Sequence, residues 1–96
     1  MRLTRGADYG ARGIIQLAKL PAGSVALVSV LAAVEGLSVS YLAKIFQELA
    51  KAGLVRSHRG ARGGFSLARP PADITLKEII EAVEAAQCLL GEEESS

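Results

Sequence analysis

The stretch that decides the fold is residues 36–65, GLSVSYLAKIFQELAKAGLVRSHRGARGGF. Ser38 is a favourable helix N-cap, and an amphipathic run of about four turns follows it. Gly53 ends this run, because glycine readily adopts the left-handed conformation that closes many helices. A short apolar segment, a basic glycine-rich loop at 59–64 and a second apolar segment come next. We therefore predict a helix, a strand, a basic hairpin loop (the wing) and a strand, in the order of a winged helix-turn-helix.

The predicted helix over 38–52 has two faces of opposite character. Residues three and four apart share a helix face, so each face can be identified from the spacing alone. The apolar stripe, expected to be buried, is Leu42, Ile45, Phe46 and Leu49. The polar stripe, with Tyr41 and Glu48 beside it, is Ser40, Lys44, Gln47 and Lys51. One face is therefore expected to anchor the helix and the other to meet a partner.

The remaining segments predict a mainly α fold with a small β-hairpin. Thr4 is a plausible N-cap for a helix over 7–20, in which Gly10 and Gly13 suggest a close approach by a neighbouring helix. Other predicted elements are a short strand at 25–28, a helix at 29–35, strands at 54–58 and 65–68, and a helix that begins at the capping box Thr75-x-x-Glu78 and ends near residue 86.

The composition points to one small domain that acts inside the cell. Ninety-six residues suffice for a single core, and half of them are hydrophobic. No apolar run approaches the length of about 20 residues that a membrane span needs, so we expect a cytoplasmic protein without membrane contact. The single cysteine excludes an internal disulfide and suits a reducing compartment.

The net charge of +1 conceals a strong asymmetry along the chain. Residues 1–69 carry ten Lys and Arg against three acids, whereas residues 70–96 carry one Lys against seven acids. A basic front of this kind suggests a polyanionic partner, and an acidic rear suggests a solvated tail.

These features predict binding to double-stranded DNA. The major groove admits one helix, and the wing arginines suit the narrower minor groove, where Arg is electrostatically favoured. His58, beside the wing and without a metal-spaced partner, is interpreted as a wing or phosphate-side residue. The candidate DNA contacts are Ser38, Ser40, Tyr41, Lys44, Gln47 and Lys51 on the helix, Arg59 and Arg62 in the wing, and Arg2, Thr4, Arg5 and Arg56 as phosphate contacts.

Two other classes of function are weighed against DNA binding. A winged-helix module that binds an acidic protein instead of DNA would share the basic face, but the arginine-rich wing argues against it. An enzyme is poorly supported, because the chain has one His, one Cys and no nucleophile or metal-spaced motif. The glycine-rich loop lies between two strands, so its context does not fit nucleotide binding.

Several motifs across nearly the whole chain resemble the Rrf family of bacterial winged-helix regulators, the group that includes IscR, NsrR and CymR. The motifs are MRLT at 1–4 with DYG at 8–10, GLSVSYL at 36–42, KAGLV at 51–55, RGARGGFSLARPP at 59–71 and ITLKEII at 74–80. The resemblance implies a dimeric transcription factor, usually a repressor, that binds a palindromic operator. It places helix 38–52 in the major groove and the wing in the minor groove.

The same resemblance raises the question of a sensor. The resemblance divides the chain into a winged helix-turn-helix DNA-binding domain at 1–87 and the start of a sensor loop at 88–96, which is expected to be disordered. The long dimerisation helix of the family is expected to be missing. In cluster-binding relatives a three-cysteine loop begins near Cys88, and in some an acidic residue at the position of Asp8 completes the iron–sulfur site. One thiolate does not hold a cluster, so a cluster would require a longer protein, unless this relative has lost the sensor. Asp8 alternatively pairs with Arg12 one helical turn later.

Overall fold

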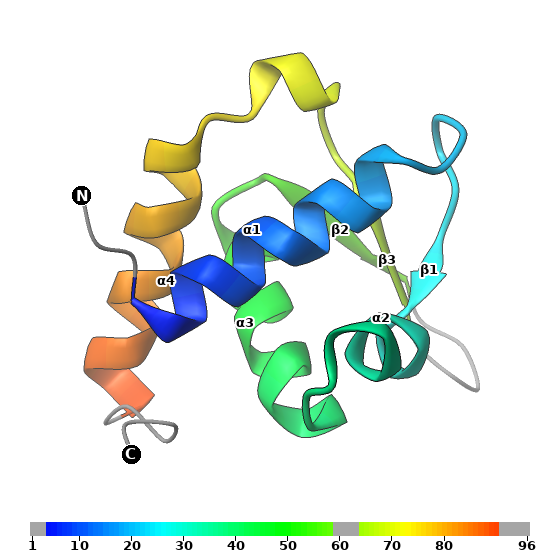
Figure 1. Cartoon of the computed structure of the whole chain (residues 1–96). Helices are drawn as coiled ribbons and strands as arrows, with labels where there is room; N and C mark the ends of the chain where they lie inside the picture. Colours follow the sequence, from blue (N-terminus) through cyan, green and yellow to red (C-terminus); the bar gives the residue numbers. More distant parts are fainter. Residues whose placement is uncertain (1–3, 59–63, 91–96) are drawn as a thin grey trace.

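A computed structural model describes the main chain of residues 4–58 and 64–90, and the side chains in these ranges up to Glu84 (Figure 1). The helix α1 runs across α3, with α4 beside them at one end and the sheet at the other. The elements, in chain order, are α1 (Arg5–Ala18), β1 (Ala26–Leu27), α2 (Val28–Glu35), α3 (Val39–Lys51), β2 (Val55–His58), β3 (Gly64–Leu67), the 3-10 turn η1 (Pro71–Asp73) and α4 (Leu76–Leu90).

The helix α3 begins and ends where its sequence predicts. The Ser38 hydroxyl accepts a hydrogen bond of 3.1 Å from the Tyr41 amide, which satisfies one of the free amides of the first turn. Beyond the C-cap, Gly53 has a φ of 82° in the left-handed region, where other residues are strained. The predicted apolar stripe is buried, with Leu42, Phe46 and Leu49 at 0% exposure and Ile45 at 3%. Both faces of α3 are thus oriented by its core contacts.

The sheet has one more strand than the predicted hairpin. The strands β2 and β3 pair antiparallel with Ser57 opposite Phe65, as expected for a wing. The strand β1 pairs with the other edge of β3, with Ala26 opposite Phe65, so the strand order is β1-β3-β2. The short strand predicted near 25–28 therefore forms, and it makes β3 the central strand.

Two glycines let α1 approach its neighbours closely, as predicted. A Cβ atom at Gly13 would overlap Cε1 and Cζ of the Phe46 ring, which comes from α3. A Cβ at Gly10 would lie 3.3 Å from Val83 Cγ2 and 3.4 Å from Ile45 Cγ2, contacts that are tight but need only small movements. The Phe46 ring therefore packs directly against the backbone of α1 at Gly13, where a side chain would not fit.

The capping box at the start of α4 forms as predicted, but the helix is longer than expected. The Thr75 hydroxyl accepts from the Glu78 amide at 3.1 Å, and a Glu78 carboxylate oxygen accepts from the Thr75 amide at 3.0 Å. The helix then continues to Leu90, whereas the sequence predicted an end near residue 86. The main chain at Cys88 is therefore helical. The division into a domain at 1–87 and a sensor loop from residue 88 stays a prediction, and residues 91–96 lie outside the described part.

In the described residues no single helix is long and apolar enough to cross a membrane. The helices α2 and α3 reach the required length and composition only as a pair, and this pair is bent by 116° at the break between them.

We predict that Gly13→Ala destabilises the fold by about 1–3 kcal/mol, because the added methyl group overpacks the Phe46 ring. Gly10→Ala is the matched control, since its methyl meets only side-chain methyl groups and also improves helix propensity. Urea unfolding followed by circular dichroism measures both variants. Equal urea midpoints for Gly13→Ala and the unsubstituted chain would contradict the close packing of Phe46 against Gly13.

Candidate nucleic-acid interface

The polar stripe of α3 faces away from the core. Ser40, Gln47 and Lys51 are exposed, and Lys44, on the same stripe, is half-buried. The apolar stripe on the opposite side of α3 is buried, so a rotation that hid the polar stripe would expose this apolar stripe. The structure therefore presents a hydroxyl, an amide and two ammonium groups along one outer face of α3, the residue types that contact bases and phosphates.

Tyr41 differs from its predicted position beside the polar stripe. It is only 7% exposed and belongs to the core cluster. Its ring packs edge-on against Tyr9 of α1, with ring centroids 5.9 Å apart and an interplanar angle of 89°. The predicted placement of Tyr41 beside the exposed stripe is therefore wrong, because its ring is held between α3 and α1. Its contact with DNA stays a prediction.

Three other predicted contact residues already have structural roles. The Ser38 and Thr4 hydroxyls cap α3 and α1, each accepting a backbone hydrogen bond of 3.1 Å. Because a hydroxyl has one donor of its own, both can still donate to a phosphate. Lys51 pairs with Glu48 at 2.9 Å on the exposed side of α3, so part of its charge is neutralised within the helix.

The structure describes two of the five arginines that we predicted to contact DNA. Arg56 is exposed on β2, and Arg5 is exposed in the first turn of α1. Arg2, Arg59 and Arg62 lie outside the described residues, so their predicted contacts stay predictions.

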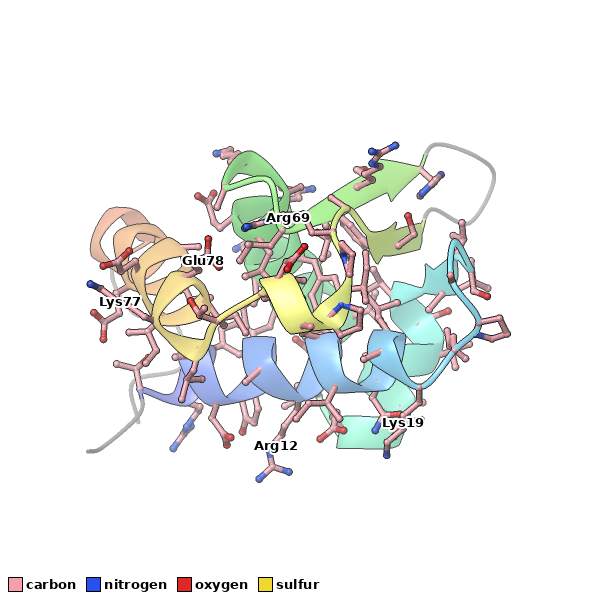
Figure 2. All side chains as sticks on the ribbon, turned by 90° about the horizontal axis from the view of Figure 1, so that it is seen from above. Arg12, Lys19, Arg69, Lys77 and Glu78 are labelled. Atoms are coloured by element: carbon pink, nitrogen blue, oxygen red, sulfur yellow. The ribbon has the colours of Figure 1, made fainter. Side chains whose placement is uncertain are left out.

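The basic residues of the first 69 positions do not form one surface. In Figure 2, Arg12 and Lys19 project from α1 on the side away from β2 and β3. Arg12 bonds to Asp8 at 3.1 Å and to Glu35 at 3.5 Å, and the hydrogen bond to Asp8 is the main cause that raises the pKa of Arg12. The asymmetry counted along the sequence therefore overstates the positive charge on the α3 face.

A salt bridge joins the exit of the wing strand to α4 (Figure 2). One nitrogen of Arg69, two residues beyond β3, donates to Glu78 Oε2 at 3.0 Å, and the other donates to the Asp73 carbonyl at 3.2 Å. The second oxygen of Glu78 caps α4 at Thr75. The hydrogen bond from the Thr75 backbone, and then that from Arg69, lower the pKa of Glu78. The sequence predicted this capping box but not its connection to the wing.

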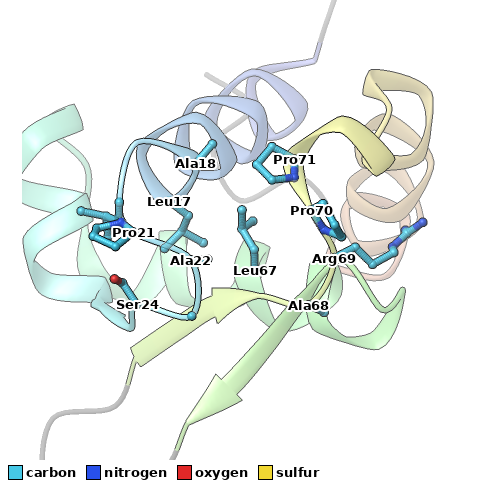
Figure 3. A pocket seen from close by; sticks show the side chains of 12 residues that line it. Leu17, Ala18, Pro21, Ala22, Ser24, Leu67, Ala68, Arg69, Pro70 and Pro71 are labelled. Carbon is cyan, nitrogen blue, oxygen red and sulfur yellow. The ribbon is translucent and has the colours of Figure 1, made fainter.

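A separate pocket of about 460 Å³ lies between the end of α1 and the segment after β3 (Figure 3). Its walls are largely apolar and include Leu17, Leu67 and Pro71, and no residue of α3 lines it. The Arg69 side chain extends toward α4, away from Leu17 and Leu67, consistent with its bond to Glu78. The pocket is therefore separate from the α3 face.

The described residues do not fit an iron–sulfur site. They contain no group of three or more His, Cys, Asp or Glu side chains placed to hold a metal ion. Asp8, one of the two suggested ligands, bonds to Arg12 as in the alternative interpretation. The side chain of Cys88, the other suggested ligand, lies outside the described part. A cluster held by several thiolates thus finds no site in this part of the chain.

The order of helices, the exposed face of α3 and the three-stranded sheet define a winged-helix domain of the kind found in transcriptional regulators, and comparison with known proteins agrees. The model of the family Rrf2, described as iron-dependent transcriptional regulator, matches residues 3–96. This chain belongs to the Rrf2 family.

Individual relatives support the assignment. A protein of Mycobacterium tuberculosis named as an HTH-type transcriptional regulator (Rv1287) is 37% identical over 84 residues, which are 88% of this chain and 52% of that protein. The structure of CymR, the global cysteine regulator of B. subtilis, superposes with a TM-score of 0.79 at 34% identity, over 88% of this chain and 65% of that one. The structure of T. potens IscR gives 0.69 at 36% identity, over 86% and 61%.

These relatives are regulators of transcription and not enzymes, which agrees with the sequence-based exclusion of catalysis. The chain spans about half the length of the curated relatives it matches.

We predict that the stabilising effect of Glu78 depends on pH. Its pKa is lowered in the folded state, so its contribution is present above the ordinary glutamate pKa of about 4.3 and is lost as the pH falls through the lowered folded value. Glu78→Gln keeps an acceptor for the Thr75 cap but loses the ion pair with Arg69, whereas Glu78→Ala loses both. The urea midpoints at neutral pH should fall in the order unsubstituted, Gln, Ala.

Below the lowered pKa, the unsubstituted chain and the Gln variant should converge, since both side chains are then uncharged. A difference that persists unchanged in acid would show that the ion pair is not its cause.

Proposed function

We propose that this chain is the DNA-binding part of a transcriptional regulator that inserts α3 into the major groove and the wing at 59–64 into the minor groove. The observation that carries the proposal is the orientation of α3. Its apolar stripe is fully buried, and this leaves Ser40, Gln47 and Lys51 on the outside. Membership of a family of transcriptional regulators supports the same function.

Within this interface the residues have different roles. Gln47 is placed to read a base edge, because a glutamine amide can both donate to and accept from adenine. Lys44, Lys51, Arg56, Arg2 and Arg5 supply positive charge to the phosphates. The neutral hydroxyls of Ser38 and Thr4 donate hydrogen bonds to them. The wing residues Arg59 and Arg62 read the width and potential of the minor groove.

We further propose that the protein acts in the cytoplasm as a homodimer that represses from a palindromic operator. A two-fold symmetric dimer matches a palindrome, because each copy of α3 then meets an equivalent half-site about one helical turn from the other. Control by an iron–sulfur cluster would require ligands outside the described residues, which supply no site for one.

Replacing Arg59 and Arg62 together with Ala should weaken DNA binding by well over tenfold, because two minor-groove cations are lost. The matched control is the double variant Lys19→Ala and Lys77→Ala, which removes the same charge from α1 and α4. Fluorescence anisotropy with a palindromic duplex at several salt concentrations measures both. Equal losses in the two variants would contradict a specific role for the wing.

The alternative function, a winged-helix module that binds an acidic protein, would be favoured by a stable protein partner together with no DNA affinity at low salt.

On α3, Gln47→Ala and Lys51→Ala should impair DNA binding in different ways. Gln47→Ala should reduce discrimination between operator and unrelated DNA, since one direct base contact is worth about 1–3 kcal/mol. Lys51→Ala should weaken binding to all sequences alike and reduce the slope of log K against log salt by about 0.9, the value for one phosphate contact. Competition assays with specific and random duplexes distinguish the two. The same loss of specificity in both variants would argue against this division of roles.

A further inference from the structure

His58 holds a defined position at the base of the wing. It is the last residue of β2, it directly precedes Arg59 in the sequence, and its side chain is half-buried. Its Nε2 atom lies 2.7 Å from Oγ of Ser66 on β3, and Ser66 is only 4% exposed. The ring is therefore tied across the hairpin to a buried hydroxyl, a bond that the sequence did not reveal.

The register of the hairpin explains why the ring leans toward Ser66. Arg56 is directly opposite Ser66, and His58 is opposite Gly64. Residues two apart on a strand share a face, so Arg56 and His58 lie on the same side of the sheet. Beside Gly64, an added Cβ would meet Val25 Cγ1 at 2.7 Å and the Ala26 carbonyl at 2.9 Å. The imidazole of His58 bonds to Ser66, diagonally across the hairpin.

Arg56 is the one other ionisable residue on the described strands of the sheet. On β2 the neighbour is Arg56, and neither β1 (Ala26–Leu27) nor β3 (Gly64–Leu67) carries an ionisable side chain. Two of the described acids already have other partners, because Glu48 pairs with Lys51 and Glu78 pairs with Arg69. Arg59 follows directly in the sequence. The described strands therefore offer no anionic partner to a charged imidazole, and a phosphate of another molecule can supply one.

Resting on the proposed DNA-binding function, we propose that His58 is a proton-dependent phosphate contact: Ser66 orients its ring at the base of the wing, and DNA binding takes up a proton there. When the ring is protonated, Nε2–H donates to Ser66 and Nδ1–H is a second donor, which forms no hydrogen bond with any described residue. A phosphate accepts from such a donor with the added attraction of opposite charge.

Two consequences follow from this coupling. By linkage, if the protonated form binds DNA more tightly, DNA affinity rises as the pH falls. Histidine is the side chain whose charge ordinarily changes between about pH 5 and 8, and this chain has only one. A pH dependence in that range can therefore be traced to a single residue by substitution.

The test is fluorescence anisotropy of this chain with a palindromic duplex from about pH 8 to about pH 5.5, at several salt concentrations. The Kd should fall about three- to tenfold over this range near 0.1 M salt, and log K against log salt should steepen by about 0.9 per bound chain, as for one added phosphate contact. Calorimetry in two buffers of different ionisation enthalpy should show net proton uptake on binding.

Two variants separate charge from structure. His58→Gln keeps hydrogen-bonding groups that can reach Ser66 but cannot become charged, so its affinity should stay at the high-pH level throughout. His58→Lys carries its charge over the whole range, so its affinity should be less dependent on pH and closer to the acid level. A role for His58 in folding alone would not change the salt slope, and circular dichroism of each variant checks the fold.

The outcomes distinguish this proposal from the function on which it rests. Tight binding with no pH dependence and no proton uptake would overturn the role of His58 and leave DNA binding intact. A pH dependence retained in His58→Gln would also overturn it. No DNA binding at any pH in low salt would overturn both. If a variant failed to fold, the salt slope and proton uptake of the unsubstituted chain would still decide.

Discussion

The packing of Phe46 against α1 is the contact on which the rest of the structure depends. Its ring is fully buried, fills the space left by Gly13, and meets Phe65 of β3 edge-on with ring centroids 5.1 Å apart. One side chain thus joins α3 to α1 and to the central strand. Burying a residue of this size contributes about 1.5–3 kcal/mol, and the direction of the contact also sets the rotation of α3. Since successive residues are about 100° apart around a helix, a one-residue change of register would turn the polar stripe away from solvent.

A second connection runs from the sheet to α4 through polar groups. Glu78 uses one carboxylate oxygen to cap α4 and the other to bind Arg69, which follows the wing strand. The start of α4 is thereby tied to the exit of β3, while its later turns pack on α1 and α3 through Ile79 and Val83. The orientations of the wing strands, α3 and α4 are consequently interdependent. A change in the direction of α4 would therefore affect the end of β3 that lies opposite the wing loop.

The electrostatic character of the interface depends on geometry more than on the number of charges. Ten basic residues precede position 70, but Arg12 and Lys19 point to the opposite side of the molecule, and Arg69 and Lys51 are paired with carboxylates. Charge counted along a chain cannot distinguish faces, because residues on one helix alternate between them. Tyr41 shows the same limit, since it borders both stripes of α3 and only the tertiary structure shows that its ring is buried and packs against Tyr9.

The sequence by itself determined the local elements: the caps at Thr4, Ser38 and Thr75, the stop at Gly53, and the two faces of α3. Capping and amphipathic spacing depend only on neighbours within a few residues. Its family motifs also identified the class of regulator. Only the tertiary structure decided which cations share a surface, that β1 joins the sheet, that Arg69 holds Glu78, and that His58 reaches Ser66. Those contacts join residues from different elements, and their distances are set by how α1, α3 and the sheet pack around Phe46, which no local pattern encodes.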